Sequence, residues 1–501
     1  MTNRSLFPHL LREQANDPAL KTHVAIADAN TQLSYPELMD AVDLRAKQFA
    51  AAGFSRGQRI AFLYDREIDL IIGMLASLIS GISFTVLSRR EGVAEAGDKL
   101  AAAGFHALVV ADSHGERGRA IANAAGIGAV AATDLGSKTD GSFALPDIAA
   151  DDEAIIIFTS GSSGKPKAVR IGHGNVASNT AGVVSMTPIG VDDHLLHIMP
   201  LSHTNGILNQ LLAPLCQGAR ITLLPRFEAE DFVRHMVALQ PTIITGVPTI
   251  YQRLLAIDIP IAATTKLRMA RCGSAPLAAE TQKAIEKHLG VEVVVSYGQT
   301  ETTCTNTSNP PGARRIGSVG RVLPGQDVAV LALDNDEVLA QGLTGEVAIR
   351  GPNIALGFVG GARFDQSAWL RTGDSGHFDE AGYLFLTGRL KEIIIRGGEN
   401  LSPVQIENLL LTQDGIQAAC VCGVPDADLG EVPVAFLEMI TGKAPDLGAL
   451  NAAIADRLSP SHRLRDVYVV DTLPTNRVGK VDRKALEVEA RSRCQQSQMS
   501  A

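Results

Sequence analysis

Residues 154–169 read AIIIFTSGSSGKPKAV, where an apolar run typical of a buried strand leads directly into a loop of small and hydroxyl residues. Glycines in such a loop leave backbone N–H groups accessible to an anion. The residues that can add N–H groups, hydroxyls or charge are Thr159, Ser160, Gly161, Ser162, Ser163, Gly164, Lys165 and Lys167. The composition indicates a phosphate-binding loop, and a plain surface turn is the alternative.

This loop does not match the motif of the P-loop ATPases, which is G-x-x-x-x-G-K-[ST]. Gly164 and Lys165 fit the motif, but Thr159 stands where its first glycine is required. Pro166 replaces its final Ser or Thr. The mismatch excludes a P-loop ATPase and leaves open which phosphate the loop holds.

The bulk composition is that of a globular protein with more than one domain. The chain has 501 residues, of which 46% are hydrophobic and 20% are charged. A net charge of −9 argues against a general nucleic-acid binder, which would present a basic surface.

Cysteine usage and the apolar segments predict a cytoplasmic protein without a membrane span. Six cysteines are too few for a disulfide framework, and Cys420 and Cys422 lie in a strand pattern that puts both thiols on one buried face. The N-terminus lacks the apolar region of a signal peptide. Residues 70–87 are long enough to span a membrane, but Gly81 divides them, so we expect a buried helix followed by a buried strand.

Strand and helix patterns alternate along most of the chain. Up to about residue 150 they predict a parallel sheet flanked by helices, and residues 191–298 predict a second one. Residues 317–388 form short, glycine-rich alternating segments typical of β structure. We therefore predict an α/β fold. Its large N-terminal domain, residues 1–390, has two flanking α/β sheets and a β-rich, barrel-like subdomain, and a small α+β domain covers residues 391–501.

Three further segments carry candidate site residues. Glu301 in SYGQTET (residues 296–302) could hold Mg²⁺ beside phosphates, or could be the acidic residue of a helix first turn. Asp374 in RTGDSG (residues 371–376) could accept two ribose hydroxyls, or could belong to an ordinary turn. Lys480 lies in a turn-rich segment, where a lone lysine is usually solvated.

Five motifs in this order resemble the core motifs of the adenylate-forming superfamily: TSGSSGKPK, YGQTE, RTGD, GRLKEIIIRGGENLSP and PTNRVGK. This superfamily contains acyl-CoA synthetases, the adenylation domains of non-ribosomal peptide synthetases, and luciferases. The resemblance spans almost the whole chain. It implies that a carboxylate attacks the α-phosphorus of ATP to give an acyl-adenylate and pyrophosphate, and that a thiol then displaces AMP to form a thioester.

The resemblance also implies roles for individual residues. The ATP and AMP site would comprise Thr159, Ser160, Gly161, Ser162, Ser163, Gly164, Lys167, Gly273, Ser274, Ala275, Tyr297, Gly298, Gln299, Thr300, Asp374, Arg389 and Lys480. Within it, Tyr297 would stack on adenine, and Lys480 would bridge the carboxylate and the α-phosphate. Glu301 and Thr159 would hold Mg²⁺. The catalytic set would be Lys480, Glu301, Thr159 and His203.

The acyl pocket matches residues 199–215, read as MPLSHTNGILNQLLAPL. It would be lined by His203, Thr204, Asn205, Gly206, Gly298, Thr303 and Cys304. A histidine satisfied by backbone at a helix start is the alternative for His203. No acidic residue lies at 202–206, and a buried ammonium without a carboxylate partner is disfavoured, so an α-amino acid substrate is not expected. The region is most similar to oxalate-, malonate- and medium-chain acyl-CoA ligases.

The C-terminal domain would be mobile and pivot at Lys391, so that the lysine motif and the RGGEN loop serve successive half-reactions. Arg396, Gly397, Gly398 and Glu399 would line the thiol tunnel. No carrier domain follows the lysine motif, so the acyl group would leave on coenzyme A or on a separate carrier protein, and we expect coenzyme A. Phosphopantetheine on a separate acyl carrier protein is the first alternative, and a luciferase-like oxygenase is the second. The acid, the pathway and the oligomeric state stay open.

Overall fold

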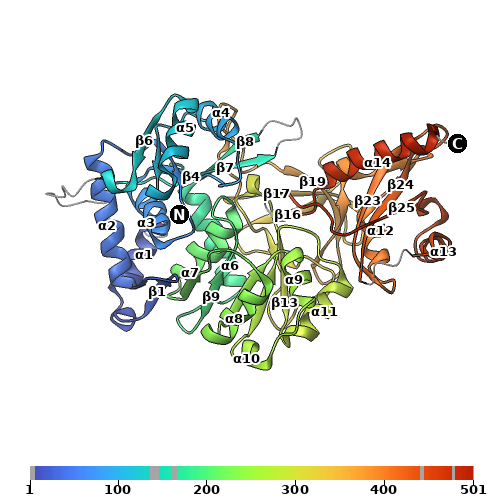
Figure 1. Cartoon of the computed structure of the whole chain (residues 1–501), viewed down its shortest axis with the longest axis horizontal. Coiled ribbons are helices and arrows are strands. Elements are labelled where there is room, and N and C mark those ends of the chain that lie inside the picture. Colours follow the sequence, from blue (N-terminus) through green and yellow to red (C-terminus); the bar gives the residue numbers. More distant parts are fainter. Residues whose placement is uncertain (1–5, 136–145, 161–165, 441–444, 477–479, 500–501) are drawn as a thin grey trace.

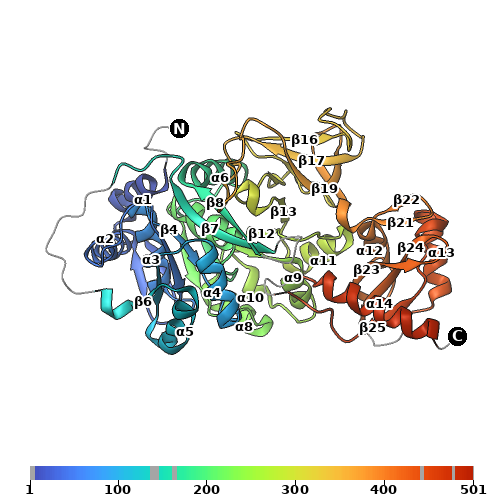
Figure 2. The same ribbon diagram turned by 90° about the horizontal axis from the view of Figure 1, so that it is seen from above.

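A computed structural model describes residues 6–135, 146–160, 166–440, 445–476 and 480–499 (Figure 1). The N-terminal elements form a large body, and the elements after β20 gather at one end of it in both views (Figure 2). This mixed α/β architecture confirms the predicted fold class.

The first sheet carries the strand that leads into the phosphate-loop candidate. Its described strands, in sheet order, are β18 (Gly357–Phe358), β8 (Pro166–Gly172), β7 (Glu153–Ser160), β4 (Ser83–Val86), β3 (Arg59–Leu63), β5 (Ala107–Val110) and β6 (Gly128–Ala131). β7 pairs antiparallel with β8, with Thr159 opposite Lys167. The candidate loop therefore joins two strands of a hairpin. A P-loop instead joins a strand to a helix, which gives the sequence mismatch a structural reason.

Helices cover this sheet, and their bounds are α1 (Phe7–Asn16), α2 (Tyr35–Ala51), α3 (Ile68–Ser80), α4 (Val93–Ala102) and α5 (Gly115–Ala125). Ser34 and Glu37 form a capping box at the start of α2. After α3 the chain turns at Gly81, whose φ of 66° favours glycine, and enters β4. This confirms the buried helix and strand expected at 70–87. Among the described residues, no helix is long and apolar enough to cross a membrane.

The second sheet provides the strand ends at which the site is built. Its described strands, in sheet order, are β15 (Arg321–Val322), β14 (Thr307–Ser308), β13 (Val293–Tyr297), β12 (Met269–Cys272), β11 (Ile243–Gly246), β9 (His194–His197), β10 (Arg220–Leu223), β1 (Val24–Ala27) and β2 (Gln32–Ser34). β1 pairs in parallel with β10. The first 150 residues therefore do not all serve the first sheet, because β1 and β2 complete the edge of the second one.

Helical elements around the second sheet are α6 (His173–Met186), η5 (Asn205–Leu212), α7 (Ala213–Leu215), α8 (Ala229–Leu239), α9 (Pro248–Leu255), α10 (Ile261–Thr264), α11 (Ala279–Leu289) and η6 (Thr300–Thr302). Arg66, beyond the end of β3, joins the two sheets. Its guanidinium donates hydrogen bonds to the carbonyls of His197, Met199 and Leu224, at the ends of β9 and β10. These contacts fix the sheets relative to each other.

The β-rich subdomain and the C-terminal domain follow. The subdomain sheet has the order β16 (Asp327–Leu331), β17 (Gly345–Arg350), β19 (Leu370–Phe378) and β20 (Leu384–Arg389). After η7 (Leu390–Glu392), the C-terminal elements are β21 (Ile394–Arg396), β22 (Glu399–Leu401), α12 (Pro403–Leu410), β23 (Ile416–Asp426), β24 (Gly430–Met439), α13 (Leu447–Arg457), η8 (Pro460–His462), β25 (Val467–Val470) and α14 (Arg483–Met499). Cys420 and Cys422 lie in one buried cluster, as their alternation in β23 predicts.

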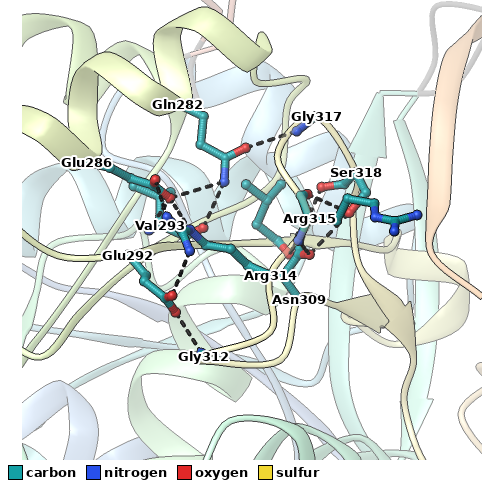
Figure 3. A network of polar contacts seen from close by, with 11 residues as sticks. Gln282, Glu286, Glu292, Val293, Asn309, Gly312, Arg314, Arg315, Gly317 and Ser318 are labelled. Atoms are coloured by element: carbon teal, nitrogen blue, oxygen red, sulfur yellow. Dashed lines mark hydrogen bonds and ion pairs between the residues drawn. The ribbon is translucent and has the colours of Figure 1, made fainter. Parts of the chain in front are cut away.

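A polar network fixes the loop between β14 and β15 against α11 and β13 (Figure 3). Arg314 binds the carboxylates of Glu286 and Glu292, each at 2.6 Å. Gln282 donates to the carbonyl of Val293 and accepts from the N–H of Gly317. The network holds β13 in place from the side opposite to its neighbour β12.

Candidate functional site

The candidate site lies where neighbouring parallel strands of the second sheet end. β11, β12 and β13 run parallel, so the loops that follow them meet at one edge. Gly273, Ser274 and Ala275 follow β12, and Tyr297 ends β13. Ser274 has a φ of 70°, a left-handed conformation that is uncommon for serine and typical of functional sites.

Gly298 begins the loop after β13 and has no room for a side chain. A Cβ at this position would lie 1.8 Å from the carbonyl oxygen of Cys304. Thr303, with a φ of 72°, turns the chain back, and its hydroxyl donates to the carbonyl of Asn353 at 2.6 Å. This tight turn explains why four predicted residues of the ATP and AMP site, Tyr297, Gly298, Gln299 and Thr300, lie next to the predicted pocket residues Thr303 and Cys304.

Asp374 is the centre of a charged cluster. The Tyr297 hydroxyl donates to one of its carboxylate oxygens at 2.7 Å, and Arg389 Nε donates to the other at 2.9 Å. Burial, together with the charge of Asp374, raises the pKa of Tyr297 well above its ordinary value. The predicted ribose-binding carboxylate is thus fixed by two other predicted site residues, which lie in β13 and at the end of β20.

Lys480 belongs to the same cluster, although it comes from the C-terminal domain. Burial lowers the pKa of its ammonium; the charge of Arg389 acts in the same direction, and that of Asp374 opposes it. Lys480 and Asn476 exchange two hydrogen bonds, from Asn476 N to Lys480 O and from Lys480 N to Asn476 Oδ1, which close the turn that carries the lysine. Lys480 is therefore not an ordinary solvated lysine.

His203 faces this cluster from the segment before η5. Burial, with the charge of Lys480 as the smaller cause, lowers the pKa of His203 to about 4, so its imidazole is neutral at pH 7. The next turn is close-packed, because a Cβ on Gly206 would lie 2.2 Å from the carbonyl oxygen of Pro200. His197 Nε2 lies 2.8 Å from the carbonyl of Gly206.

Polar side chains surround the predicted acyl pocket. Asn209 of η5 donates to Asn205 Oδ1, Cys304 Sγ and Thr305 Oγ1. Arg271, which was not predicted from the sequence, donates from Nη1 to the carbonyl of Asn209 at 3.2 Å. A single arginine inside the apolar strand pattern MARC was the signal that could have identified it.

Glu301 lies in the short helical turn η6, closed by a hydrogen bond from Thr302 N to the carbonyl of Gln299. This agrees in part with the alternative of an acidic residue in a helix first turn. Among the described residues, no three His, Cys, Asp or Glu side chains cluster as metal ligands. One carboxylate still suits Mg²⁺, which is usually held by one or two carboxylates together with substrate phosphates.

Most of the phosphate-loop candidate, including Gly161, Ser162, Ser163, Gly164 and Lys165, lies outside the described residues, as does the side chain of Ser160. Of its flanks, Thr159 Oγ1 lies 3.4 Å from the carbonyl of Lys167. The Lys167 ammonium lies 5.0 Å from the centre of the Phe358 ring, a cation–π contact at the edge of the loop.

The predicted thiol-tunnel residues form the turn between β21 and β22. Gly397 and Gly398 have φ values of 56° and 85°, which the turn requires. Arg396 is half-buried, and its Nη1 donates to the carbonyls of Ser461 and Arg463. Glu399 accepts a hydrogen bond from the Ser461 hydroxyl. The predicted hinge residue Lys391 is exposed in η7.

Comparisons with known proteins agree on one family. The AMP-binding enzyme family matches residues 11–359, and the AMP-binding enzyme C-terminal domain matches residues 405–480. A feruloyl-CoA synthase from Amycolatopsis sp is 32% identical, with 91% of this chain and 94% of the relative covered. An oxalate–CoA ligase from Arabidopsis thaliana is 29% identical, with 90% and 92% covered. The crystal structure of ATP-bound MatB from Rhodopseudomonas palustris superposes with a TM-score of 0.89 at 30% identity, covering 97% of this chain and 98% of that one.

Proposed function

The chain belongs to the AMP-binding enzyme family, and we propose that it activates a carboxylic acid with ATP and transfers the acyl group to the thiol of coenzyme A. In the first step a carboxylate oxygen bonds to the α-phosphorus of ATP while the bond to pyrophosphate breaks. In the second step the thiol sulfur bonds to the acyl carbon, AMP leaves, and the thiol proton is released.

The observation that carries this proposal is the position of Lys480 beside Asp374, Arg389 and His203. An adenylating enzyme mainly has to position two anions and neutralise the charge between them. Lys480 would bridge the acid and the α-phosphate in this role. The neutral His203 adds no charge to that of Lys480 and Arg389 and would line the path between acid and thiol.

The remaining roles follow the motifs. Asp374, fixed by Tyr297 and Arg389, would accept the ribose hydroxyls. Gly273, Ser274, Ala275 and Gly298 would form the adenine slot, since they follow adjacent strand ends. The hairpin loop between β7 and β8 would hold the β- and γ-phosphates. Glu301 and Thr159 would hold Mg²⁺, which neutralises phosphate charge when it is bound.

Replacement of Lys480 by Ala tests the proposal. We expect adenylation to fall by at least about 100-fold, as for loss of one transition-state contact. Thioester formation from supplied acyl-adenylate and coenzyme A should be spared. ATP–pyrophosphate exchange measures the first step, and thioester release measures the second.

Lys484→Ala is the matched control, because Lys484 is exposed four residues later in the same segment. Undiminished pyrophosphate exchange by Lys480→Ala would contradict the role given to Lys480. Formation of ADP instead of AMP by the wild type would contradict the proposed function itself. Acyl transfer to an acyl carrier protein but not to coenzyme A would show that the acceptor is the carrier protein instead of coenzyme A.

A further inference from the structure

Arg271 is a buried cation at the edge where the site is built. It is the penultimate residue of β12 and is only 5% exposed. Its neighbours Ala270 and Cys272 pack in the cluster formed with α8, α9 and α11, so strand alternation directs Arg271 to the opposite face. That face meets η5, where Arg271 reaches the Asn209 carbonyl.

In the described part of the chain, Arg271 has no carboxylate within ion-pair distance. Its guanidinium is nevertheless charged at pH 7, because burial lowers its pKa only to about 10. Two half-buried arginines, Arg59 and Arg66, have more partners than Arg271. Arg59 pairs with Glu153, and Arg66 donates to three carbonyls. A buried charge with a single hydrogen bond is costly unless a further partner arrives.

The surroundings of Arg271 belong to the predicted acyl pocket. Cys304 lies close enough for its sulfur to interact with the guanidinium, and it also contacts the Thr204 hydroxyl and the Asn209 amide. An apolar acyl tail would bury these hydroxyl, amide and guanidinium groups without giving them hydrogen-bond partners, which is unfavourable. They are suited to a negatively charged group with several oxygen acceptors.

We propose that Arg271 is a specificity-determining residue that binds a second anionic group of the acid, a carboxylate or a sulfonate, on the side away from the reacting carboxylate. This inference rests on the proposed function and narrows its substrate to small acids with two negative charges. The second anionic group of the substrate would accept the remaining hydrogen bonds of Arg271. An acid without that second charge would leave the guanidinium without an ion-pair partner.

Pairs of acids that differ in one charge at nearly equal size test this role. Oxalate and oxamate, malonate and malonamate, and succinate and succinamate are such pairs, and sulfoacetate tests a sulfonate. For wild-type protein we expect kcat/KM to favour the dianion of at least one pair by on the order of 100-fold, the scale of a buried charge pair. The ratio of kcat/KM for the dianion to kcat/KM for the amide, measured on one preparation, is independent of the fraction of folded enzyme.

Two variants separate substrate binding from support of η5. Arg271→Met should reduce the preference for the dianion to within about threefold, mainly through a higher KM for the dianion, and kcat/KM for the amide should change far less. Arg271→Lys keeps the charge and should retain most of the preference. Thermal unfolding of each variant reports the structural contribution of the Asn209 contact.

The outcomes distinguish the two levels of the proposal. If none of these acids and no wider panel of mono- and aryl carboxylic acids releases pyrophosphate, the proposed function fails. If thioesters form but the wild type favours the amide or an apolar acid, the inference about Arg271 is wrong. The same holds if Arg271→Met leaves the dianion ratio unchanged.

Discussion

Gly298 is the residue at which backbone packing constrains the site most directly. An added methyl group would overlap the carbonyl oxygen of Cys304, a backbone atom that cannot rotate away. We expect Gly298→Ala to destabilise the fold by about 1–3 kcal/mol, the usual cost of overpacking. Because the loop carries Tyr297 and Glu301, we also expect kcat/KM to fall by on the order of 100-fold. Denaturant unfolding and pyrophosphate release measure the two effects.

Gly128→Ala is the matched control, since no atom lies within 4 Å of the position of its Cβ. This variant should keep both stability and activity. If Gly298→Ala behaved like Gly128→Ala, the close approach between Gly298 and Cys304 would not describe the protein.

Residues inside a motif and residues outside any motif differ in how well the sequence predicts their roles. Tyr297, Asp374 and Lys480 were predicted from quoted motifs, and the structure brings them together. Arg271 lies in no motif. Its role depends on which strands neighbour β12 and on which element packs against the sheet face that carries its side chain. The partners of Arg396, carbonyls more than 60 residues away, are likewise set by tertiary packing and could not be predicted from the sequence.

At the scale of elements, α14 is tied to the rest of the C-terminal domain by its first residue. Arg483 pairs with Glu407 of α12 at 2.7 Å and with Glu392 of η7 at 3.2 Å, and it donates to the carbonyl of Val421 in β23. Arg483→Met would leave these half-buried carboxylates without this partner. The cost should be below the about 3–5 kcal/mol of a fully buried pair and above the about 1 kcal/mol of a surface pair. We expect a lower thermal midpoint and weaker adenylation, because Lys480 lies three residues before Arg483.

Arg491→Met is the control for this prediction, since Arg491 is exposed on the same helix. Differential scanning calorimetry and pyrophosphate exchange provide the measurements. An unchanged midpoint for Arg483→Met would show that α14 does not depend on these pairs.

Local sequence patterns predict the helices and strands better than they predict which strands pair with each other. The strands at residues 59–63, 107–110 and 243–246 are apolar runs bounded by helices, as the alternation predicted up to residue 150 and over residues 191–298 requires. The pairing of β1 with β10 joins residues almost 200 positions apart, and no local pattern specifies it. The π-helical hydrogen bonding of η5 was likewise not predicted from the sequence pattern.

At the scale of the whole molecule, the arrangement of the two domains is the least predictable feature. The sequence indicates a boundary near Lys391 but does not specify how the C-terminal domain is oriented against the N-terminal one. Here the C-terminal domain places Lys480 near His203 and Asp374. Ser402 also donates to the carbonyl of Thr387 across the predicted boundary. This is the arrangement that the first half-reaction would need.

Buried histidines make the stability of the whole protein sensitive to acid. Burial is the main cause that lowers the pKa of His173, His194 and His203, each to about 4, from an ordinary value near 6.5. Between these values the unfolded chain binds more protons than the folded one, so stability is full above about pH 6.5 and falls toward pH 4. We expect each histidine to remove about 1–2 kcal/mol between pH 7.5 and 5.5.

His173 allows a direct test of this acid sensitivity. Neither of its ring nitrogens has a hydrogen-bond partner among the described residues, and leucine has a similar volume. His173→Leu should therefore unfold at a similar denaturant concentration at pH 7.5 and be more stable than wild type at pH 5.5 by about 1–2 kcal/mol. Equal pH slopes for the two proteins would show that His173 is protonated without cost, and would contradict its burial as a neutral group.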